Sequence, residues 1–418
     1  MAVVGTGRVG LPFAAVCSKY YNTIGIDTDK DLVRRVNEQG NFSEPLVSEY
    51  VRTHNLRATT EFGRIEKCDF IFVCVGSQSA GEGYSSSNLV NALNVVTPHL
   101  ISKNQILVIM TTLPLSTFDT VIIPYLSNRG VLERIAGFCY NPTMIALGNA
   151  VRDFEHPNYL LVGESNPEAG ARLQSFWTRI VGDTIPIFRS SLSNIELAKY
   201  ALNTALVLKI TLMNALTELS EKVGADIDVQ AEILKADPRI AGQKMFKGGL
   251  GYGGTCFPVD VEAFRSACEQ LDVPTSLADA MQSLNERQVQ RTVELIKSQG
   301  KKRVSILGVT YKPDTSVVVA SQSLQVAEQL AKENYEVILY DPMGLESAKA
   351  QLGTRVLYSD DIQKAISFGN VVFLGVEWPQ IRSLQAESFR KDQIVIDPWR
   401  ILKSIPLRCT YLPYGRRN

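Results

Sequence analysis

The chain has 418 residues, and its 43 Lys and Arg balance 43 Asp and Glu, so the formal net charge is zero. This length exceeds what one hydrophobic core normally serves, which predicts two or three domains. A neutral balance without a basic block excludes the charge pattern of nucleic-acid-binding proteins.

Cysteine and histidine usage limits the function further. The seven cysteines show no C-x-x-C spacing, and only three histidines occur, so we expect neither a disulfide framework nor a metal site. The first residues lack a charged and then apolar leader, and no apolar run reaches membrane-spanning length. We therefore expect a soluble cytoplasmic protein in a reducing compartment, without a membrane partner.

The first third of the chain alternates short β-branched runs with helical patterns. The runs that predict strands are 23–26, 70–75 and 106–110. Strands separated by helices are typical of a parallel sheet with crossover connections.

The middle of the chain has a different pattern. From 191 to 224 apolar residues recur at helical spacing, which predicts a long and mostly buried helix, with Ser193 or Asn194 as its N-cap. A second helix is predicted from 276 to 298, with Gly300 at the position after its end. Beyond it the strand and helix alternation resumes, with predicted strands at 304–308, 337–341, 371–376 and 393–397.

A phosphate-binding signature opens the chain. Gly5, Gly7 and Gly10 follow a short apolar run and precede a helical pattern, with Val9 inside the turn. Glycines at this spacing allow a tight turn, close approach of the backbone to a pyrophosphate and close packing of helix on strand. Asp27 ends the next predicted strand, where a carboxylate accepts hydrogen bonds from ribose hydroxyls and repels a 2′-phosphate. The motif predicts NAD rather than NADP; the alternative is a Gly-rich turn in an ordinary βα unit.

The run Gly251-Tyr252-Gly253-Gly254-Thr255-Cys256-Phe257-Pro258-Val259-Asp260 carries the strongest chemical signal. Glycines let a backbone come close to a ligand, and a thiol with a carboxylate four residues later is arranged like a nucleophile with its acid/base partner. The alternative is a buried thiol in a Gly-rich turn, because free cysteine is among the most buried residue types.

Together these motifs resemble the UDP-glucose/GDP-mannose dehydrogenase family over nearly the whole chain. The resemblance rests on short segments in a fixed order, which are 5–11, 44–46, 111–114, 141–142, 153–163, 196–200 with Asn203, 239–240, 251–260, 307–312, 340–342 and 377–378. It implies two Rossmann-like parallel-sheet domains joined by a helical central domain with a long core helix. The implied boundaries are 1–190 for the NAD-binding domain, 191–300 for the central dimerisation and catalytic domain, and 301–418 for the domain that binds the nucleotide sugar.

The resemblance also implies a reaction and the roles of five residues. The C6 alcohol of a nucleotide sugar would be oxidised to the carboxylate with two NAD+ in succession, through a thioester on Cys256. Asp260 would act as acid/base and water partner, while Lys199 and Asn203 would face the oxyanion at C6. Thr112 would place a water molecule. For Lys199 the alternative is a solvated surface lysine.

Substrate binding is implied for residues of the second half of the chain. Lys312, beside Tyr311 at a predicted strand end, corresponds to the family lysine that neutralises the diphosphate. Arg239 matches an arginine that the family uses on the sugar, although alone it reads as a surface charge. Three further residues either line the pocket or, for the aromatic ones, pack in the core: Lys247, Tyr252 and Phe257.

The chain departs from the family pattern at several positions. Thr143 stands where the pattern has Glu, Val259 replaces a lysine before Asp260, and Val319 replaces an arginine that helps to hold the cofactor. Ser77-Gln78 also replaces an expected Thr-Pro pair. These losses favour, as an alternative to a working enzyme, a low-activity or regulatory paralogue that still binds nucleotide sugar.

Segment 141–163 is more similar to the glucose and mannose branches than to the N-acetylhexosamine branch. UDP-glucose is the favoured substrate, with GDP-mannose or a UDP-N-acetylhexosamine as alternatives. The family's long central helix typically forms a subunit contact, so we expect a homodimer.

Overall fold

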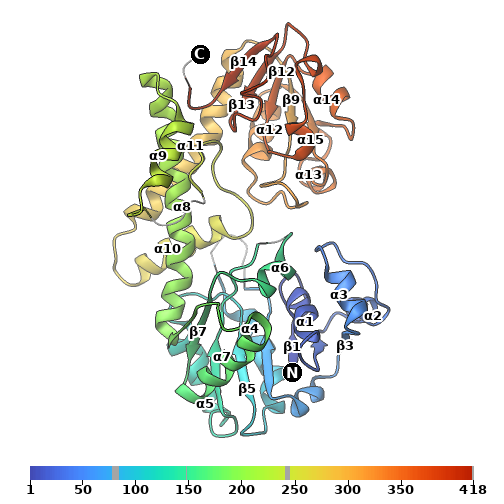
Figure 1. Ribbon diagram of the computed structural model, residues 1–418, viewed down its shortest axis with the longest axis vertical. Coiled ribbons are helices and arrows are strands. Elements are labelled where there is room, and N and C mark those ends of the chain that lie inside the picture. Colours follow the sequence, from blue (N-terminus) through green and yellow to red (C-terminus); the bar gives the residue numbers. More distant parts are fainter. Residues whose placement is uncertain (78–83, 147, 241–244, 417–418) are drawn as a thin grey trace. The chain divides into compact units, whose positions relative to one another are not determined.

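The structure is a computed structural model that describes residues 1–77, 84–146, 148–240 and 245–416. By their internal contacts the residues form two compact units, Met1–Ala201 and Leu202–Asn418, each with its own sheet. The boundary falls inside α8 (Leu192–Val223), the long helix that the apolar spacing predicts (Figure 1). The sequence-based boundaries at 190 and 300 stay predictions.

The first unit contains a doubly wound sheet. Within its described residues, eight strands lie in the order β3-β2-β1-β4-β5-β6-β7-β8. The order reverses between β1 and β4, and at such a point ligands bind beyond the carboxyl ends of the strands. The strands are β1 (Ala2–Val4), β2 (Ile24–Ile26), β3 (Arg57–Thr59), β4 (Phe70–Val73), β5 (Ile106–Ile109), β6 (Gly137–Tyr140), β7 (Leu160–Glu164) and β8 (Ile187–Ser191).

Helices cover this sheet and close its core. On one face, Phe13 of α1 packs against Phe72 of β4 and against Trp177 of α7. The described helices are α1 (Gly10–Ser18), α2 (Lys30–Asn37), α3 (Val47–Thr53), α4 (Ser87–Val96), α5 (Ile123–Asn128), α6 (Ala150–Glu155) and α7 (Pro167–Val181), with the short turns η1 (Phe62–Lys67), η2 (Thr97–His99) and η3 (Phe118–Ile122).

One strand pair of this sheet departs from the parallel arrangement that the sequence predicts. β7 pairs antiparallel with β6, and β8 then runs parallel to β7. A parallel crossover needs a connection that returns along the whole sheet. The connection between β6 and β7 contains the six-residue helix α6 and does not return along the sheet. The chain therefore turns back at the carboxyl edge.

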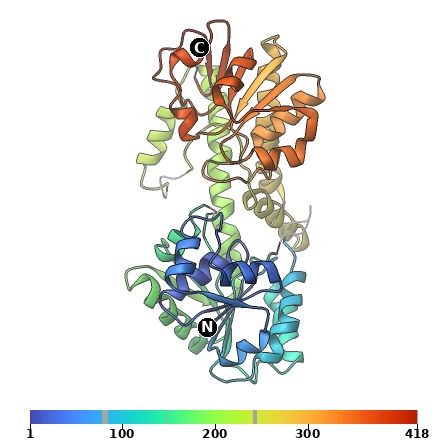
Figure 2. The same ribbon diagram turned by 90° about the vertical axis from the view of Figure 1, so that its right-hand side faces the viewer.

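The second unit repeats the same strand order. Its six described strands lie in the order β11-β10-β9-β12-β13-β14, all parallel. Figure 2 shows this part of the chain in orange and red. Two separate hydrophobic clusters fill the two faces, one with α11 and α12 and the other with α14. The strands are β9 (Arg303–Leu307), β10 (Glu336–Tyr340), β11 (Leu357–Tyr358), β12 (Val371–Leu374), β13 (Ile394–Asp397) and β14 (Thr410–Pro413).

The helices of the second unit come in two groups. The central group consists of the larger part of α8 with α9 (Ile227–Ala236), α10 (Phe257–Gln270) and α11 (Ser276–Ser298). The group around the sheet consists of α12 (Gln322–Lys332), α13 (Leu345–Leu352), α14 (Ile362–Phe368) and α15 (Pro379–Arg382), with η4 (Gly353–Arg355) and η5 (Ala386–Ser388). Among the described residues, none of the helices combines the length and apolarity needed to cross a bilayer.

The ends of α8 and α11 can be compared with the helix ends that the sequence predicts. Gly300 has φ +63° just after α11, which confirms the predicted left-handed position at the helix end. The predicted N-cap of the long helix is wrong, because α8 begins at Leu192 directly after β8. Ser193 and Asn194 lie in its first turn, where Asn194 Nδ2 donates to Ser190 Oγ at 2.8 Å.

Candidate active site

The loop after β1 has the geometry of a dinucleotide-binding turn. Gly5 adopts φ +84°, and its N–H donates to the Ile26 carbonyl at 2.9 Å. A Cβ on Gly10 would lie 1.9 Å from the Gly5 carbonyl oxygen, so only glycine fits at the start of α1. A Cβ on Gly7 would meet no atom within 4 Å, so the space in front of this turn is open. Val9 precedes the helix as its N-terminal flanking residue.

Asp27 fixes this turn to the neighbouring strand. Its Oδ2 accepts hydrogen bonds from the Thr6 N–H at 2.6 Å and from the Thr6 hydroxyl at 3.1 Å. Thr6 is fully buried, whereas Asp27 is half-buried and keeps a side open to solvent. The open turn, the helix N-terminus and this carboxylate fit the pyrophosphate and ribose of NAD.

The second unit contains a similar turn after β9, but the carboxylate next to it is enclosed by protein groups. Gly308 has φ +94° and donates to the Tyr340 carbonyl at 2.7 Å, and Thr310 donates through both N–H and hydroxyl to Asp341 Oδ2. Here Trp378 Nε1 also donates to Asp341 at 3.1 Å, and the carboxylate is buried. Asp341 is therefore enclosed by protein donors and differs from Asp27 in having no face for a ribose.

Cys256 lies at the N-terminus of a helix in the second unit. It directly precedes α10 and its side chain is exposed, so the alternative of a buried thiol is wrong. The positive end of a helix favours a negatively charged sulfur. The Thr255 hydroxyl lies 3.7 Å from Cys256 Sγ.

Asp260 lies in the first turn of the same helix. Its N–H donates to the Cys256 carbonyl at 2.8 Å, and its side chain is fully buried. Asn203 of α8 donates from Nδ2 to Asp260 Oδ2. The structure thus brings together three of the predicted catalytic residues, Cys256, Asp260 and Asn203, within one unit.

Lys199 and Thr112 belong to the first unit. Lys199 is only 7% exposed, so the alternative of a solvated surface lysine is wrong. Its Nζ donates to the Thr143 carbonyl at 3.1 Å, at the carboxyl end of β6. Thr112 is half-buried in the loop after β5, and one turn of α8 holds this loop because the Tyr200 hydroxyl donates to the Leu113 carbonyl at 2.9 Å.

Glu196, one turn before Lys199, holds the same loop. It is 2% exposed, and its Oε1 accepts a hydrogen bond from the Phe118 N–H at 3.3 Å. Burial raises the pKa of this carboxyl to about 7, although hydrogen bonds from backbone N–H groups of residues 116–118 oppose the increase. The first turns of α8 therefore fasten the strand-end loops that carry Thr112 and Thr143.

The predicted diphosphate lysine lies near the cysteine segment in the second unit. Lys312 Nζ lies 5.8 Å from the Tyr311 ring centre, and both residues are half-buried. Gly254, at φ +85°, packs so closely on this ring that a Cβ would lie 2.6 Å from it. Tyr311 and the segment before Cys256 are therefore in direct contact.

The remaining predicted substrate residues have different surroundings. Arg239 is exposed and pairs with Asp237, and Lys247 is exposed and pairs with Glu377. Tyr252 is buried in a hydrophobic cluster that Phe257 borders. The roles of these residues stay predictions.

The departures from the family pattern also have structural surroundings. Val259 is half-buried in the first turn of α10. Val319 exposes its side chain, while its carbonyl accepts the Gly254 N–H at 2.9 Å. Gln78 lies outside the described residues.

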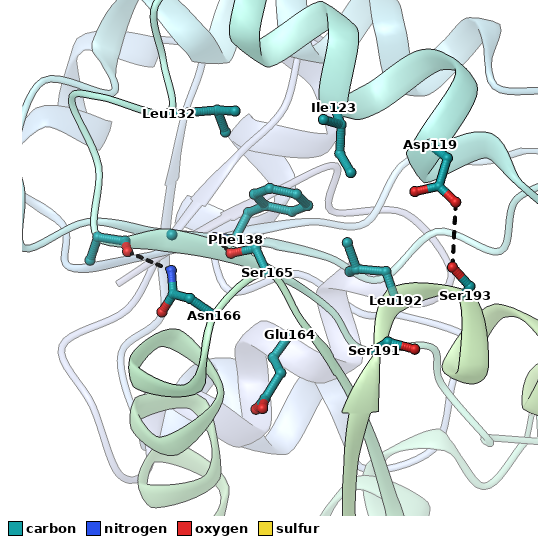
Figure 3. A pocket seen from close by; sticks show the side chains of 12 residues that line it. Asp119, Ile123, Leu132, Phe138, Glu164, Ser165, Asn166, Ser191, Leu192 and Ser193 are labelled. Atoms are coloured by element: carbon teal, nitrogen blue, oxygen red, sulfur yellow. Dashed lines mark hydrogen bonds between the residues drawn. The ribbon is translucent and has the colours of Figure 1, made fainter.

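A cavity of about 420 Å³ lies elsewhere in the first unit (Figure 3). It opens at the amino end of β6, whereas the Gly5 turn lies at the carboxyl edge of the sheet. The residues that line it include Asp119, whose carboxylate accepts the Ser193 hydroxyl at 3.4 Å. None of the predicted site residues borders this cavity.

Some residues that support the site are not indicated by the sequence motifs. Thr6 stands between two motif glycines, and Glu196 lies inside a matching segment, yet neither receives a role from the motif alone. Asn214 and Asn285 interrupt apolar helix faces, and a buried amide in such a place is a signal of a specific hydrogen-bond partner.

The two repeated nucleotide-binding folds and the cysteine–carboxylate pair define a dinucleotide-dependent dehydrogenase with a second nucleotide-binding domain. Three family models match the chain: the UDP-glucose/GDP-mannose dehydrogenase NAD binding domain over 1–181, its central domain over 193–287 and its UDP binding domain over 305–404. The chain belongs to the UDP-glucose/GDP-mannose dehydrogenase family.

Individual relatives agree with this assignment. The chain is 30% identical to a UDP-glucose 6-dehydrogenase of Rickettsia conorii, with 96% of this chain and 94% of the relative covered. It is 29% identical to the putative UDP-glucose 6-dehydrogenase YtcA of Bacillus subtilis, with 96% of each covered. A solved UDP-glucose dehydrogenase of Pyrobaculum islandicum superposes with a TM-score of 0.87 at 26% identity, covering 98% of this chain and 96% of the other.

These findings confirm the resemblance and the fold class that the motifs predict. They also confirm NAD as the cofactor, because the NAD binding domain of the family covers the Gly5 turn and Asp27. The protein is an NAD-dependent nucleotide-sugar dehydrogenase.

Proposed function

We propose that this enzyme oxidises the C6 alcohol of UDP-glucose to the uronic acid in two successive oxidations through Cys256. The observation that carries the proposal is the arrangement in the second unit. An exposed thiol at a helix N-terminus is followed one turn later by the fully buried Asp260, whose carboxylate Asn203 holds. A nucleophile, a carboxylate and an amide donor are the groups that oxidation of an aldehyde to an acid requires.

The reaction assigns distinct tasks to the two oxidations. When bound, NAD+ supplies the oxidising chemistry by accepting a hydride from C6 each time. After the first oxidation the Cys256 sulfur forms a bond to the aldehyde carbon and gives up its proton, and the second oxidation then leaves a thioester. Water attacks this thioester, the carbon–sulfur bond breaks, and the acid and the free thiol are released.

The other residues control protons and charge. Asp260, held by Asn203, takes the proton of the attacking water. Lys199 and Asn203 stabilise negative charge on the C6 oxygen by ammonium and amide donors. Thr112 positions a water molecule through its hydroxyl. Gly5, Gly7, Val9, Gly10 and Asp27 bind the cofactor.

Support for the nucleotide sugar comes from the second unit and from the relatives. Lys312 offers a charge to a diphosphate, with Tyr311 beside it. We assign the sugar to Arg239 and the pocket wall to Lys247, Tyr252 and Phe257. UDP-glucose is favoured because the relatives of Rickettsia and Bacillus carry that name.

We also propose that a second copy of the chain covers the exposed face of α8. Leu208, Leu212, Leu219 and Val223 are exposed at spacings of four and seven residues, which places them along one helix face in the second unit. Val229 and Ile233 of α9 add to the exposed apolar surface. Exposed apolar side chains in a row along one helix face are typical of a protein interface, and a homodimer would bury them.

Incubation with NAD+ and a panel of UDP- and GDP-sugars tests the function. We expect NADH absorbance and a product mass of UDP-glucuronate from UDP-glucose, with two NADH for each acid formed. Cys256→Ser should abolish acid formation, and an undiminished yield of acid from that variant would refute the thioester route. Faster turnover of GDP-mannose or of a UDP-N-acetylhexosamine would change the assigned substrate.

A low-activity or regulatory paralogue is the second candidate, and Thr143, Val259 and Val319 favour it. The arginine missing at Val319 removes one charge-assisted hydrogen bond, a loss of about 1.5 to 3 kcal/mol in cofactor binding. The same panel separates the candidates. Measurable binding of UDP-glucose without any NADH would support the paralogue and contradict the working enzyme.

A further inference from the structure

The segment that leads to Cys256 is fastened by side-chain amides. Residues 246–255 form neither helix nor strand, so their peptide groups need partners elsewhere. Asn214 of α8 supplies two of them. Its Oδ1 accepts the Gly249 N–H at 3.1 Å, and its Nδ2 donates to the Leu250 carbonyl at 3.1 Å.

Asn285 of α11 makes the same double contact two residues further along. Its Oδ1 accepts the Tyr252 N–H at 2.7 Å, and its Nδ2 donates to the Tyr252 carbonyl at 3.1 Å. A side-chain amide carries the same donor and acceptor as a peptide group, so each asparagine makes the pair of hydrogen bonds that a peptide group of a neighbouring strand would make. Asn214 and Asn285 thus hold the segment from two different helices.

The fit around these amides is tight. A Cβ on Gly251 would lie 1.9 Å from Asn285 Oδ1, so the backbone reaches the amide only because this residue is glycine. Tyr252 anchors the segment further, since its ring is buried in the cluster between α8, α10 and α11. The Gly254 N–H then donates to the Val319 carbonyl at 2.9 Å. The backbone is therefore fixed on several sides up to two residues before Cys256.

We infer that Asn214 and Asn285 are positioning residues that hold the Cys256 sulfur at the N-terminus of α10. Both asparagines lie in long helices, which makes them rigid supports. A sulfur that has to reach a carbonyl carbon gains most of its rate from correct placement, and a displacement of about 1 Å costs up to roughly 100-fold. This inference rests on the proposed role of Cys256 as nucleophile.

The test replaces each asparagine by alanine in the full-length enzyme. For Asn285→Ala and Asn214→Ala we expect kcat for acid formation to fall roughly 10- to 100-fold, while the KM for NAD changes less than about threefold because the Gly5 turn is untouched. The matched control is Gln282→Ala, because Gln282 lies on α11 one turn before Asn285, is exposed and, among the residues that the structure describes, hydrogen-bonds only within the helix, to Glu286. This control should keep the wild-type kcat.

Hydrogen exchange provides a readout that does not depend on catalysis. In the wild-type enzyme the Gly249 and Tyr252 amides should exchange at least tenfold more slowly than an unprotected peptide, although they belong to no helix or strand. Asn285→Ala should remove the protection of Tyr252. Unprotected amides in the wild-type enzyme, or full kcat in a variant that has lost the protection, would overturn the inference.

The same experiments separate this inference from the proposed function. If Cys256 is not the nucleophile, Cys256→Ser keeps its acid yield, and the exchange of the segment still reports whether the asparagines hold it. If Cys256 is the nucleophile and the asparagines do not position it, Cys256→Ser loses the acid while Asn285→Ala keeps the wild-type kcat.

Discussion

Glu196 should make the stability of the first unit depend on pH in an unusual direction. Its carboxyl is 2% exposed and accepts backbone hydrogen bonds at the start of η3. Burial raises its pKa from the ordinary 4.5 to about 7, so the native state favours the protonated form. The stabilisation is fully present below pH 4.5 and is lost as the pH rises through 7.

Glu196→Gln removes this titration while keeping the side-chain oxygen that accepts the Phe118 N–H. A pKa difference of one corresponds to about 1.4 kcal/mol, so the difference of about 2.5 between folded and unfolded values amounts to about 3 kcal/mol. Between pH 5 and pH 9 the variant should therefore gain about 2 to 3 kcal/mol relative to wild type. For a unit of about 200 residues this equals roughly 5 to 10 °C in Tm.

The assay is the Tm difference between variant and wild type, measured by calorimetry at several pH values in one buffer system. Glu155→Gln is the control of opposite sign. Burial acts to raise the pKa of Glu155, but hydrogen bonds from Lys19 and Tyr50 outweigh it and lower the pKa, so the contribution of Glu155 is present at high pH and lost as the pH falls. If the Glu196→Gln difference stays constant from pH 5 to pH 9, Glu196 does not titrate there and the reasoning fails.

Three further changes test the cofactor turn, the cysteine segment and the proposed dimer. Asp27→Asn should weaken NAD binding by about tenfold, or about 1.4 kcal/mol, because the ribose loses a charged acceptor. Calorimetric titration measures the Kd for NAD, and an unchanged Kd would contradict the role of Asp27. Gly254→Ala should destabilise the second unit by about 2 to 4 kcal/mol, because alanine is strained at φ +85° and its Cβ would lie 2.6 Å from the Tyr311 ring. The control is Gly300→Ala, at φ +63° with no atom within 4 Å of the Cβ. There only the backbone strain remains, so the Tm should fall less. Leu219→Lys should convert a dimer into monomers, as measured by light scattering. The control Val95→Lys, at an exposed apolar position of the first unit, should leave the dimer intact. Equal masses for the two variants would argue against the α8 interface.

The strands that the sequence predicts are those with continuous β-branched runs. Ile106–Ile109 and Val371–Leu374 are fully buried, and a strand covered on both faces shows this pattern. β3 and β11 are not predicted from the sequence because they are short edge strands with exposed residues, such as Arg57 and Leu357. β8, at the other edge of the first sheet, is not predicted because Arg189 and the serines interrupt its apolar pattern.

Some residues of the candidate site can be predicted from the sequence and others cannot. Cys256 and Asp260 are four residues apart, so the sequence alone indicates that they share a helix turn. The partner amides come from distant parts of the chain, with Asn203 lying 57 positions before Asp260 and Asn285 lying 33 positions after Tyr252. Such pairs depend on how helices pack, which local spacing does not encode.

The exchange of a carboxylate for Thr143 changes the charge around Lys199. In the first unit the Lys199 ammonium donates to the main-chain carbonyl of Thr143 at 3.1 Å, so residue 143 lies beside this ammonium, and its side chain is neutral where the family pattern has a carboxylate. Loss of a carboxylate beside a buried ammonium strengthens the interaction of that ammonium with negative charge that develops nearby. In the proposed mechanism we therefore expect Lys199 to stabilise an oxyanion at C6 well, and Asp260 to be the acid/base group that remains for proton transfer. Hydrolysis of the thioester, which needs a water molecule to lose its proton, is then the step that the exchange slows most, and the acyl form of Cys256 should accumulate during turnover.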